Sequence, residues 1–273
     1  MQPLTLINGS ATRTLASSDR GFNFGQGVST RIKVVAGKAQ LWRFHMQALQ
    51  QGCAALGFPI NAVDKLVKRD LGILPKADLS LRVTLTAGVG SNSAATPVEY
   101  QPTRVLQIEP DNFVEPPVEG VDLWLCETPL SIHPRLAGIK HLNRLEQVLA
   151  RSEWRDPHIR EGVMFDTQGY VIGATASNIF WVQSGEVYTP DLSQAGVAGV
   201  MRAALLERAR QLGIEVHSVR ARLADLEAAD ELFLTNAFDG VMAVKACAQK
   251  QYAVGSGTLT QKLRTELAQV LYD

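Results

Sequence analysis

The sequence predicts a protein of two domains with mixed α+β and α/β structure. Its 273 residues exceed one ordinary domain of about 150 residues. Alternating segments typical of strands and segments with apolar residues three or four positions apart, typical of helices, recur in both halves. Residues 110–120 carry three prolines and no periodicity, which is typical of a boundary. We therefore predict a smaller α+β domain over residues 1–109, a linker over 110–120 and a larger domain over 121–273.

The composition narrows the class of protein. Lys and Arg together number 27, as do Asp and Glu, so the chain has no net charge. This balance argues against a general nucleic-acid binder and against a protein held on anionic membranes. The start, MQPLTLINGS, lacks the basic and apolar regions of a signal peptide. No apolar stretch approaches the roughly 18 residues of a membrane span. We expect a soluble, cytoplasmic protein.

The first half begins with strands and turns. Leu4 to Ile7 alternates as a strand before an Asn8-Gly9 turn, and a second hairpin is expected around Gly37-Lys38. A helix is predicted over 41–56, ended by Gly57 and Pro59. Another is predicted over 61–72 with Asn61 as its N-cap. Strands follow over 81–86, where apolar and polar residues alternate, and over 103–109.

The second half begins with a strand over 121–127. After Lys140, apolar residues at helical spacing predict a helix face, made of Leu142, Leu145, Val148 and Leu149. Two strand pairs are predicted next, 162–165 with 170–172 and 178–182 with 187–189. A glycine-bearing segment, 195–202, then leads into a helix that ends near Gly213. A strand over 231–235, a turn at 236–240 and a helix from Thr258 complete the chain.

Cysteines and histidines give no sign of a metal site. The three cysteines, Cys53, Cys126 and Cys247, lie far apart, which fits neither a disulfide framework nor zinc ligation. The five histidines lack ligand spacing. His45 lies on the apolar face of its predicted helix, where a structural role is the simpler interpretation. We predict no metal.

Two features could carry chemistry. Residues 195–202 (AGVAGVMR) place backbone N–H groups at a helix start, where an anion such as phosphate can bind. Lys140 stands where a helical pattern begins, so the positive end of that helix would lower the pKa of its amine and favour a nucleophile. An ordinary loop-to-helix junction and a solvated lysine remain the alternatives.

These residues also carry a resemblance. LAGIKHLNRLEQVLAR, which contains Lys140, closely resembles the lysine segment of the 4-amino-4-deoxychorismate lyases. That family belongs to the fold-type IV pyridoxal-phosphate enzymes, together with the branched-chain and D-amino-acid aminotransferases. Further segments resemble family motifs in the same order, almost from end to end: DRGFNFGQG (19–27), SNIFW (177–181), YTPDLSQAGVAGVMR (188–202) and ADELFLTNAFDGVMAV (229–244).

The resemblance implies a two-domain homodimer that binds pyridoxal 5'-phosphate and a small-molecule substrate, with no nucleic-acid or membrane partner. It implies conversion of 4-amino-4-deoxychorismate to 4-aminobenzoate and pyruvate, a step towards folate. Lys140 would form the Schiff base with the cofactor and then act as general base and acid. Asn178, in the matching strand motif, is expected to be a cofactor-binding residue. Positions that cradle the cofactor phosphate in relatives correspond to Val200, Met201, Asn236 and Ala237.

The sequence departs from the family pattern at three places. Gly173 stands where relatives have a glutamate that binds the pyridine nitrogen. Ala48 stands where relatives have an arginine that pairs with the phosphate, and Arg43 is our candidate to replace it. The usual GDG-x-F-E-T segment reads GQGVSTR, residues 25–31. Losing one charge-assisted phosphate contact would cost about 1.5–3 kcal/mol of cofactor binding.

Two other functions therefore stay open. One is an aminotransferase of the same fold, and the other is a non-catalytic or repurposed member with weakened cofactor binding, which Gly173 and Ala48 favour. The sequence does not place the groups that bind the substrate's carboxylates. The candidates are Arg31, Arg43, Arg151 and Arg202, and a surface salt bridge is the simpler role for each.

Overall fold

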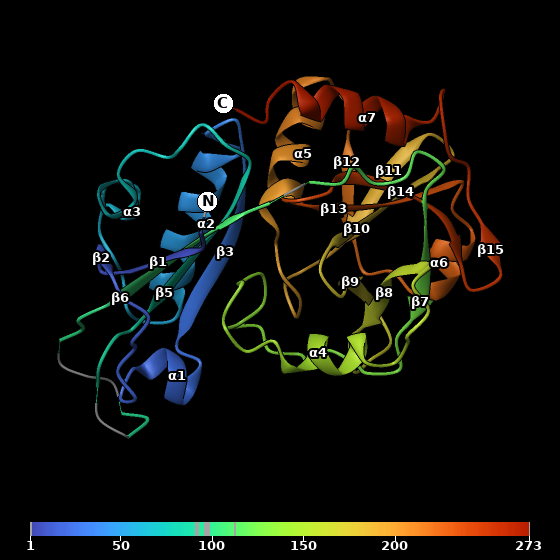
Figure 1. The fold of residues 1–273 in the computed structure, drawn as a ribbon. Coiled ribbons are helices and arrows are strands. Elements are labelled where there is room, and N and C mark those ends of the chain that lie inside the picture. Colours follow the sequence, from blue (N-terminus) through green and yellow to red (C-terminus); the bar gives the residue numbers. More distant parts are fainter. Residues whose placement is uncertain (1, 91–92, 96–98, 112, 273) are drawn as a thin grey trace. The chain divides into compact units, whose positions relative to one another are not determined.

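The computed structural model describes residues 2–90, 93–95, 99–111 and 113–272 (Figure 1). The chain forms two compact units. Unit 1 comprises Met1–Phe113, Ile139–Asn143 and Tyr272–Asp273, and unit 2 comprises Val114–Gly138 and Arg144–Leu271. Each unit combines one sheet with helices, so the predicted mixed α/β class is confirmed.

The first unit is built on a six-stranded sheet in the order β2-β1-β6-β5-β3-β4, and every neighbouring pair is antiparallel. Alternation explains the core: Leu81, Val83 and Leu85 of β5 are fully buried, whereas Arg82 between them is exposed. The strands are β1 (Leu4–Ile7), β2 (Ser10–Ala11), β3 (Gly27–Val35), β4 (Lys38–Ala39), β5 (Leu79–Thr86) and β6 (Thr103–Pro110).

Three helices complete this unit: α1 (Arg20–Phe24), α2 (Trp42–Ala55) and α3 (Val63–Leu71). Helix α2 packs on β3 and β5 through buried residues that include Leu49 and Cys53. The predicted cap of α3 was wrong. Its N-cap is Ala62, which has a left-handed backbone with φ of 54° and no side-chain cap. The core therefore sets this start, because Val63 and Val67 are fully buried.

The second hairpin turn was misplaced by one residue. Val35 pairs with Lys38, so the turn residues are Ala36 and Gly37. Both have positive φ, 49° and 80°, as a two-residue hairpin turn of this hand requires. The glycine signal was correct, but it marks the second turn position instead of the first.

The second unit contains a nine-stranded mixed sheet in the order β12-β11-β10-β13-β14-β7-β8-β9, with β15 paired to β14. β7 lies parallel to both β14 and β8, and β11 lies parallel to β12. The strands are β7 (Val121–Leu125), β8 (Ile159–Phe165), β9 (Val171–Ala174), β10 (Asn178–Gln183), β11 (Glu186–Pro190), β12 (Val216–Val219), β13 (Glu231–Asn236), β14 (Gly240–Cys247) and β15 (Lys250–Gln251).

The helices of this unit are α4 (Leu145–Arg151), α5 (Val200–Gln211), α6 (Leu223–Glu227) and α7 (Leu259–Ala268). Helices α5 and α7 pack on each other and on β13 (Figure 1). Strand β10 is buried on both faces, since Ile179 and Trp181 join one core cluster while Phe180 stacks on Phe233 at 5.1 Å between ring centroids. The helix predicted from Thr258 begins at Leu259, and Thr258 is its N-cap, accepting a hydrogen bond from the Gln261 N–H.

The helix predicted to follow Lys140 directly begins only at Leu145. The intervening segment is extended and pairs with β3: the Lys140 carbonyl accepts from the Ser29 N–H, and the Leu142 N–H donates to the Gly27 carbonyl. Lys140 therefore lies before the first turn of α4, where a helix dipole has little effect. The expectation that Lys140 stands at the start of this helix is thus wrong.

The cysteines and His45 have structural surroundings. All three cysteines are buried and unbridged, and burial raises the pKa of each thiol to about 12. His45 is fully buried with its Nδ1 2.6 Å from the Thr30 hydroxyl, and burial lowers its pKa to about 3. A neutral imidazole in the core is the result. Among the described residues, no helix has the length and apolar character needed to cross a membrane.

Candidate functional site

The start of α5 has the features of an anion cradle. The Asn178 side chain fixes the preceding loop: its Oδ1 accepts from the Gly199 N–H at 3.0 Å, and its Nδ2 donates to the Val197 carbonyl at 2.7 Å. A Cβ on Gly199 would approach Asn178 Oδ1 to 2.4 Å, so this close contact depends on glycine. No side chain caps α5, whose first residues are Val200 and Met201. Backbone N–H groups at such a helix start can bind a phosphate.

A second turn lies close to this loop. Strands β10 and β13 pair with Asn178 opposite Thr235, so Asn236 lies beside the Asn178 end of β10. Asn236 Oδ1 accepts from the Phe238 and Asp239 N–H groups at 2.8 and 2.7 Å. These bonds fix the turn that contains Ala237. The structure thus brings together the predicted positions 178, 200, 201, 236 and 237 in one unit.

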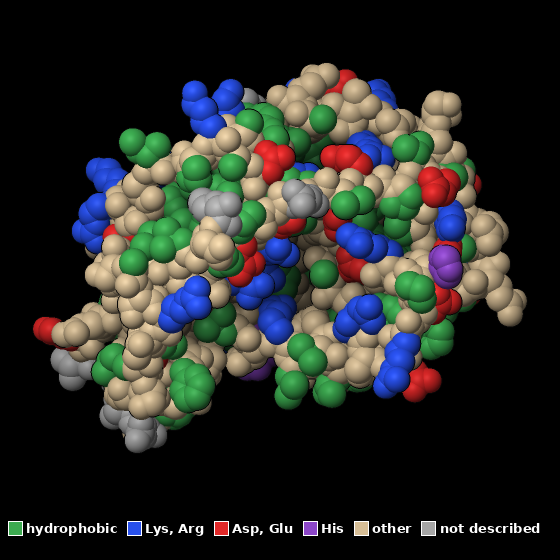
Figure 2. Space-filling model, in the orientation of Figure 1, with side chains coloured by type: hydrophobic (Ala, Val, Ile, Leu, Met, Phe, Trp, Pro, Cys, Tyr) green, Lys and Arg blue, Asp and Glu red, His purple; other side chains and the backbone are tan. Residues whose placement is uncertain are grey.

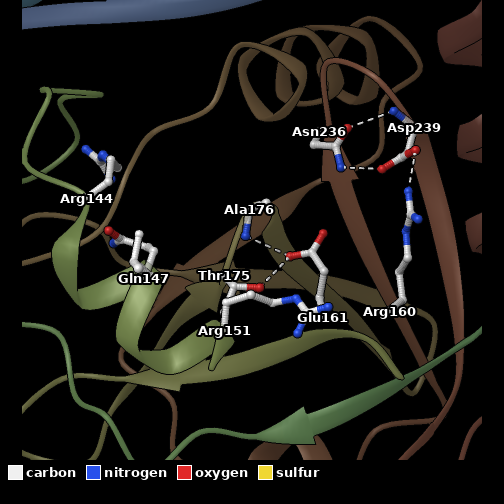
Figure 3. Close-up of a pocket in the computed structure, with 10 residues that line it drawn as sticks. Arg144, Gln147, Arg151, Arg160, Glu161, Thr175, Ala176, Asn236 and Asp239 are labelled. Atoms are coloured by element: carbon white, nitrogen blue, oxygen red, sulfur yellow. Dashed lines mark hydrogen bonds and ion pairs between the residues drawn. The ribbon is translucent and has the colours of Figure 1, made fainter. Parts of the chain in front are cut away.

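A cavity of about 550 Å³ lies in the same unit (Figure 3). Its volume falls within the range of small-molecule sites. Its wall is contributed by α4, by the first half of β8, by the turn between β9 and β10 and by the turn between β13 and β14. The lining residues are Arg144, Gln147, Val148, Arg151, Arg160, Glu161, Thr175, Ala176, Asn236 and Asp239.

Glu161 is the buried acid of this cavity. Its carboxylate accepts hydrogen bonds from the Ala176 N–H at 2.8 Å and from the Ser177 hydroxyl, with the Thr175 hydroxyl at 3.4 Å. Burial raises the pKa of this carboxyl above its usual value, and the bonds from Ser177 and Ala176 oppose that rise. The sequence prediction missed Glu161, because the strand was expected to begin at Gly162. The sequence signal that could have indicated Glu161 is the turn Thr175-Ala176-Ser177, because its N–H and hydroxyl donors need an acceptor when they are buried.

Polar side chains connect Glu161 to the second turn. Ser177, which donates to Glu161, accepts from Asn236 Nδ2 at 3.0 Å. The same Nδ2 donates to Asp239 Oδ2 at 2.8 Å, and Asp239 Oδ1 pairs with Arg160 at 2.9 Å. Figure 3 shows the Asn236, Asp239 and Arg160 part of this network along one side of the cavity. The position of Asn236 is therefore fixed by four hydrogen bonds.

One face of helix α4 lines the part of the cavity wall across from Asn236 and Asp239 (Figure 3). Arg144, Gln147, Val148 and Arg151 follow the i, i+3, i+4, i+7 spacing that places residues on one helix face. Burial lowers the pKa of Arg144 to about 10. Arg151 stacks over the Trp154 ring at 4.6 Å and donates to the Trp154 carbonyl. In the described part of the chain, Gln147 Oε1 is buried without a hydrogen-bond partner.

Lys140 lies in unit 1, as does Arg43, the candidate to replace the family's phosphate-binding arginine. The exposed side chain of Lys140 belongs to Ile139–Asn143. Two residues earlier, Gly138 of unit 2 exchanges backbone hydrogen bonds with Gly196 and Ala198, which precede α5. Along the chain, Lys140 follows Gly138 by two residues and precedes Arg144 by four. Arg43 is exposed and stacks over the Phe44 ring at 4.2 Å; its phosphate contact stays a prediction.

The remaining arginines named from the sequence differ in their surroundings. Arg31 pairs with Asp111 at 3.2 Å and donates to the Ser80 hydroxyl, which is the salt-bridge role expected of it. Arg202 lies close to the Pro190 carbonyl at 3.4 Å. Of the four candidates for carboxylate binding, only Arg151 lines the cavity.

Gly173 lies buried on β9, opposite Met164 of β8. It contributes no side chain to the site. A Cβ at this position would approach the Ser177 carbonyl oxygen to 3.2 Å, so a larger residue requires a shift of a few tenths of an ångström. Its φ is not positive, and the backbone therefore accepts other residues.

Comparison with known proteins gives consistent matches. A family model described as amino-transferase class IV matches residues 27–247. An aminodeoxychorismate lyase from Vibrio harveyi is 30% identical over 266 residues, which cover 96% of this chain and 98% of the relative. The crystal structure of 4-amino-4-deoxychorismate lyase from Pseudomonas aeruginosa has a TM-score of 0.90 and 37% identity, covering 99% and 100% of the two chains. An aminotransferase from Brucella abortus bound to the co-factor PLP has a TM-score of 0.81 and 20% identity, covering 99% of each chain; this likeness shows the fold alone.

Proposed function

The chain belongs to the amino-transferase class IV family, and on that premise we propose that it is a pyridoxal-phosphate-dependent lyase. Its substrate would be 4-amino-4-deoxychorismate, and its products 4-aminobenzoate and pyruvate, on the route to folate. The likeness to the Pseudomonas lyase carries this proposal, because it extends over the whole chain at a higher identity than the likeness to the Brucella aminotransferase. The lysine segment around Lys140 supports the same choice.

The described residues fit the cofactor's phosphate. The uncapped N-terminus of α5 offers the Val200 and Met201 N–H groups, and Gly199 lets the Asn178 side chain approach closely and fix the loop before them. Asn178 and Asn236 hold the two turns in place. When bound, pyridoxal phosphate withdraws electrons from the substrate carbon that bears the amino group. We propose that these residues anchor it by its phosphate.

Lys140 would perform the proton transfers. Its Nζ would hold the cofactor covalently and be released by the substrate amine. As a free amine, Nζ would then take the proton from the carbon that bears the substrate's amino group. Loss of that proton leaves the electron pair that expels the enolpyruvyl oxygen, so the ring becomes aromatic. The released enol takes up a proton to give pyruvate.

Turnover tests this function directly. Purified protein supplied with pyridoxal phosphate should form 4-aminobenzoate and pyruvate in equal amounts from aminodeoxychorismate. If neither product forms, the proposed function is wrong. Exchange of amino groups between D-alanine and a keto acid, with no 4-aminobenzoate, would favour an aminotransferase instead.

Substitution of Gly173 tests how much cofactor affinity and turnover depend on the glutamate that relatives have at this position. Gly173→Glu should raise cofactor affinity and turnover about tenfold, because a charge-assisted hydrogen bond to the pyridine nitrogen contributes about 1.5–3 kcal/mol. Fluorescence titration with pyridoxal phosphate measures the affinity. Gly173→Gln is the matched control, since it has the same shape without the charge. Equal gains in both variants would mean that filling space, and not charge, improves the site.

The exposed apolar face of α4 supports a homodimer. Leu145, Val148 and Leu149 are 68%, 60% and 51% exposed, and Figure 2 shows hydrophobic side chains gathered over α4 at the lower edge of the molecule. A helix face of this kind is usually covered by another surface. We propose that a second copy of the chain covers this face. The other partner that we propose is the small-molecule substrate, and we propose no nucleic-acid partner.

A charge on this face should break the dimer. Leu149→Glu should convert a dimer into a monomer in sedimentation-velocity experiments, because association would bury the carboxylate. Ile73→Glu is the control, since Ile73 is 97% exposed in unit 1. A wild-type chain that sediments as a monomer would contradict the proposed dimer.

A further inference from the structure

Thr235 carries a buried hydroxyl group near the end of β13. The residue is 1% exposed, and within the described part of the chain its Oγ1 has no hydrogen-bond partner. Most buried polar groups in proteins are paired, because an unpaired one lowers the stability of the fold. The strand itself does not require a hydroxyl here, since valine has the same shape and suits a strand equally well. The hydroxyl of Thr235 therefore needs an explanation other than the stability of β13.

The pairing of the strands places this hydroxyl beside the Asn178 side chain. Thr235 lies directly opposite Asn178 of β10. Residues paired in this way project from the same face of an antiparallel sheet, with Cβ atoms about 4.5–5.5 Å apart. Phe233 and Phe180 form the next pair on that face and stack on each other. Thr235 therefore lies on the face of the sheet from which Asn178 contacts Gly199, the N-cap of α5.

The Asn178 amide connects this face of the sheet to the start of α5. Its Oδ1 accepts from the Gly199 N–H at 3.0 Å, and its Nδ2 donates to the Val197 carbonyl at 2.7 Å. An amide oxygen has two lone pairs, and the Gly199 N–H takes one of them. The oxygen can therefore accept a second hydrogen bond, and the hydroxyl of Thr235 is a donor on the directly paired residue.

We propose that Thr235 is a positioning residue of the phosphate cradle, whose hydroxyl donates to Asn178 Oδ1 when an anion binds at the start of α5. This inference rests on the proposed function, because it takes the cofactor phosphate as that anion. A bound phosphate attracts the N–H groups of Val200 and Met201, and Asn178 follows the preceding loop because it is bonded to that loop through both atoms of its amide. The hydroxyl of Thr235 then gains a partner, and this hydrogen bond makes phosphate binding tighter.

The variant Thr235→Val tests the role of the hydroxyl, since it keeps the shape of the side chain. In a fluorescence titration of the full-length protein, the variant should bind pyridoxal phosphate about threefold to tenfold more weakly than wild type, as the loss of one neutral hydrogen bond predicts. Its affinity for pyridoxal, which has no phosphate, should equal that of the wild type. Without cofactor, the variant should unfold at a temperature about 1–3 °C higher, because it no longer buries this hydroxyl.

Thr189 provides a matched control in the same sheet. It is also 1% exposed, but its hydroxyl donates to the Ile179 carbonyl at 2.9 Å. Thr189→Val should therefore lower the unfolding temperature of the cofactor-free protein and leave the ratio of the two affinities unchanged. Thr235→Ser retains a hydroxyl and should keep the wild-type preference for pyridoxal phosphate over pyridoxal.

Two results would overturn the proposal. One is a Thr235→Val variant that loses no affinity for pyridoxal phosphate, or that loses affinity for both ligands equally. The other is a fall in its unfolding temperature like that of Thr189→Val, since the hydroxyl would then be bonded before any anion binds.

The same preparations separate this inference from the proposed function. If Thr235→Val loses affinity for pyridoxal phosphate alone, yet the wild type converts no aminodeoxychorismate, the role of Thr235 is supported and the lyase is contradicted. If the wild type turns over the substrate and Thr235→Val binds pyridoxal phosphate as tightly, only the role of Thr235 is contradicted. A wild type that binds no pyridoxal phosphate would contradict both.

Discussion

Replacement of Lys140 by alanine is expected to abolish lyase turnover, with a loss of at least about a thousandfold. The variant lacks both the amine that holds the cofactor and the base that removes the substrate proton, and a positioned base alone contributes roughly 10²–10⁴-fold. The visible absorbance of protein purified with pyridoxal phosphate should show a band from a lysine-bound cofactor in the wild type. That band should be missing in Lys140→Ala.

The control keeps the test specific. Lys65 is an exposed lysine of α3, and Lys65→Ala should retain both the band and the turnover. Borohydride reduction followed by peptide mapping should place the modified lysine at residue 140. A band that persists in Lys140→Ala would assign the cofactor to another lysine and contradict our central site residue. If neither protein shows a band, a repurposed fold with weakened cofactor binding becomes the better interpretation.

Glu161→Leu is expected to cause the largest loss of stability. Its carboxylate is the acceptor for the Ala176 N–H and the Ser177 hydroxyl in the interior. Leucine leaves both donors without that acceptor, and each unsatisfied buried group costs about 1–3 kcal/mol. The free energy of unfolding, measured with urea, should fall by about 3–5 kcal/mol. Because Ser177 also contacts Asn236, cofactor affinity should fall as well.

The isosteric variant Glu161→Gln should differ from the wild type in how its stability depends on pH. Burial raises the pKa of Glu161 in the folded protein, so the folded chain holds this proton to a higher pH than the unfolded chain does. Between the ordinary pKa near 4.5 and the raised value, stability therefore falls as pH rises. Glutamine resembles the protonated acid and does not titrate, so the variant should gain stability relative to wild type over that window. Parallel stability curves for the two proteins would contradict the raised pKa.

Local patterns in the sequence predicted most of the fold. The strict alternation of β5 and the strong turn signal at Asn8-Gly9 gave the correct strands and the correct first hairpin. Shorter elements were missed, among them α1 and α6, because five residues carry too little periodicity to distinguish a helix from a loop. The start of α4 was misplaced because Leu142 continues an apolar pattern, although its backbone pairs with Gly27.

The candidate site was predicted unevenly, for a physical reason. Motif positions such as Asn178 and Val200 are close in the sequence to the turns they build, so the resemblance could name them, and their contact with the cofactor stays a prediction. The cavity wall depends on tertiary contacts instead. Glu161 reaches the turn after β9 from a neighbouring strand, and the cavity face of α4 becomes meaningful only once Arg144 and Gln147 line the same space. No local pattern carries that information.

The uncapped start of α5 has a thermodynamic consequence for the living cell. Backbone N–H groups at a helix start that no side chain satisfies can be satisfied by water or by a ligand. At α5 the ligand would be pyridoxal phosphate, and its binding adds RT ln(1 + [L]/Kd) to the free energy of unfolding. The amount of folded protein would then depend on the supply of the vitamin from which pyridoxal phosphate is made. Starvation for that vitamin would lower the abundance of the protein as well as its activity.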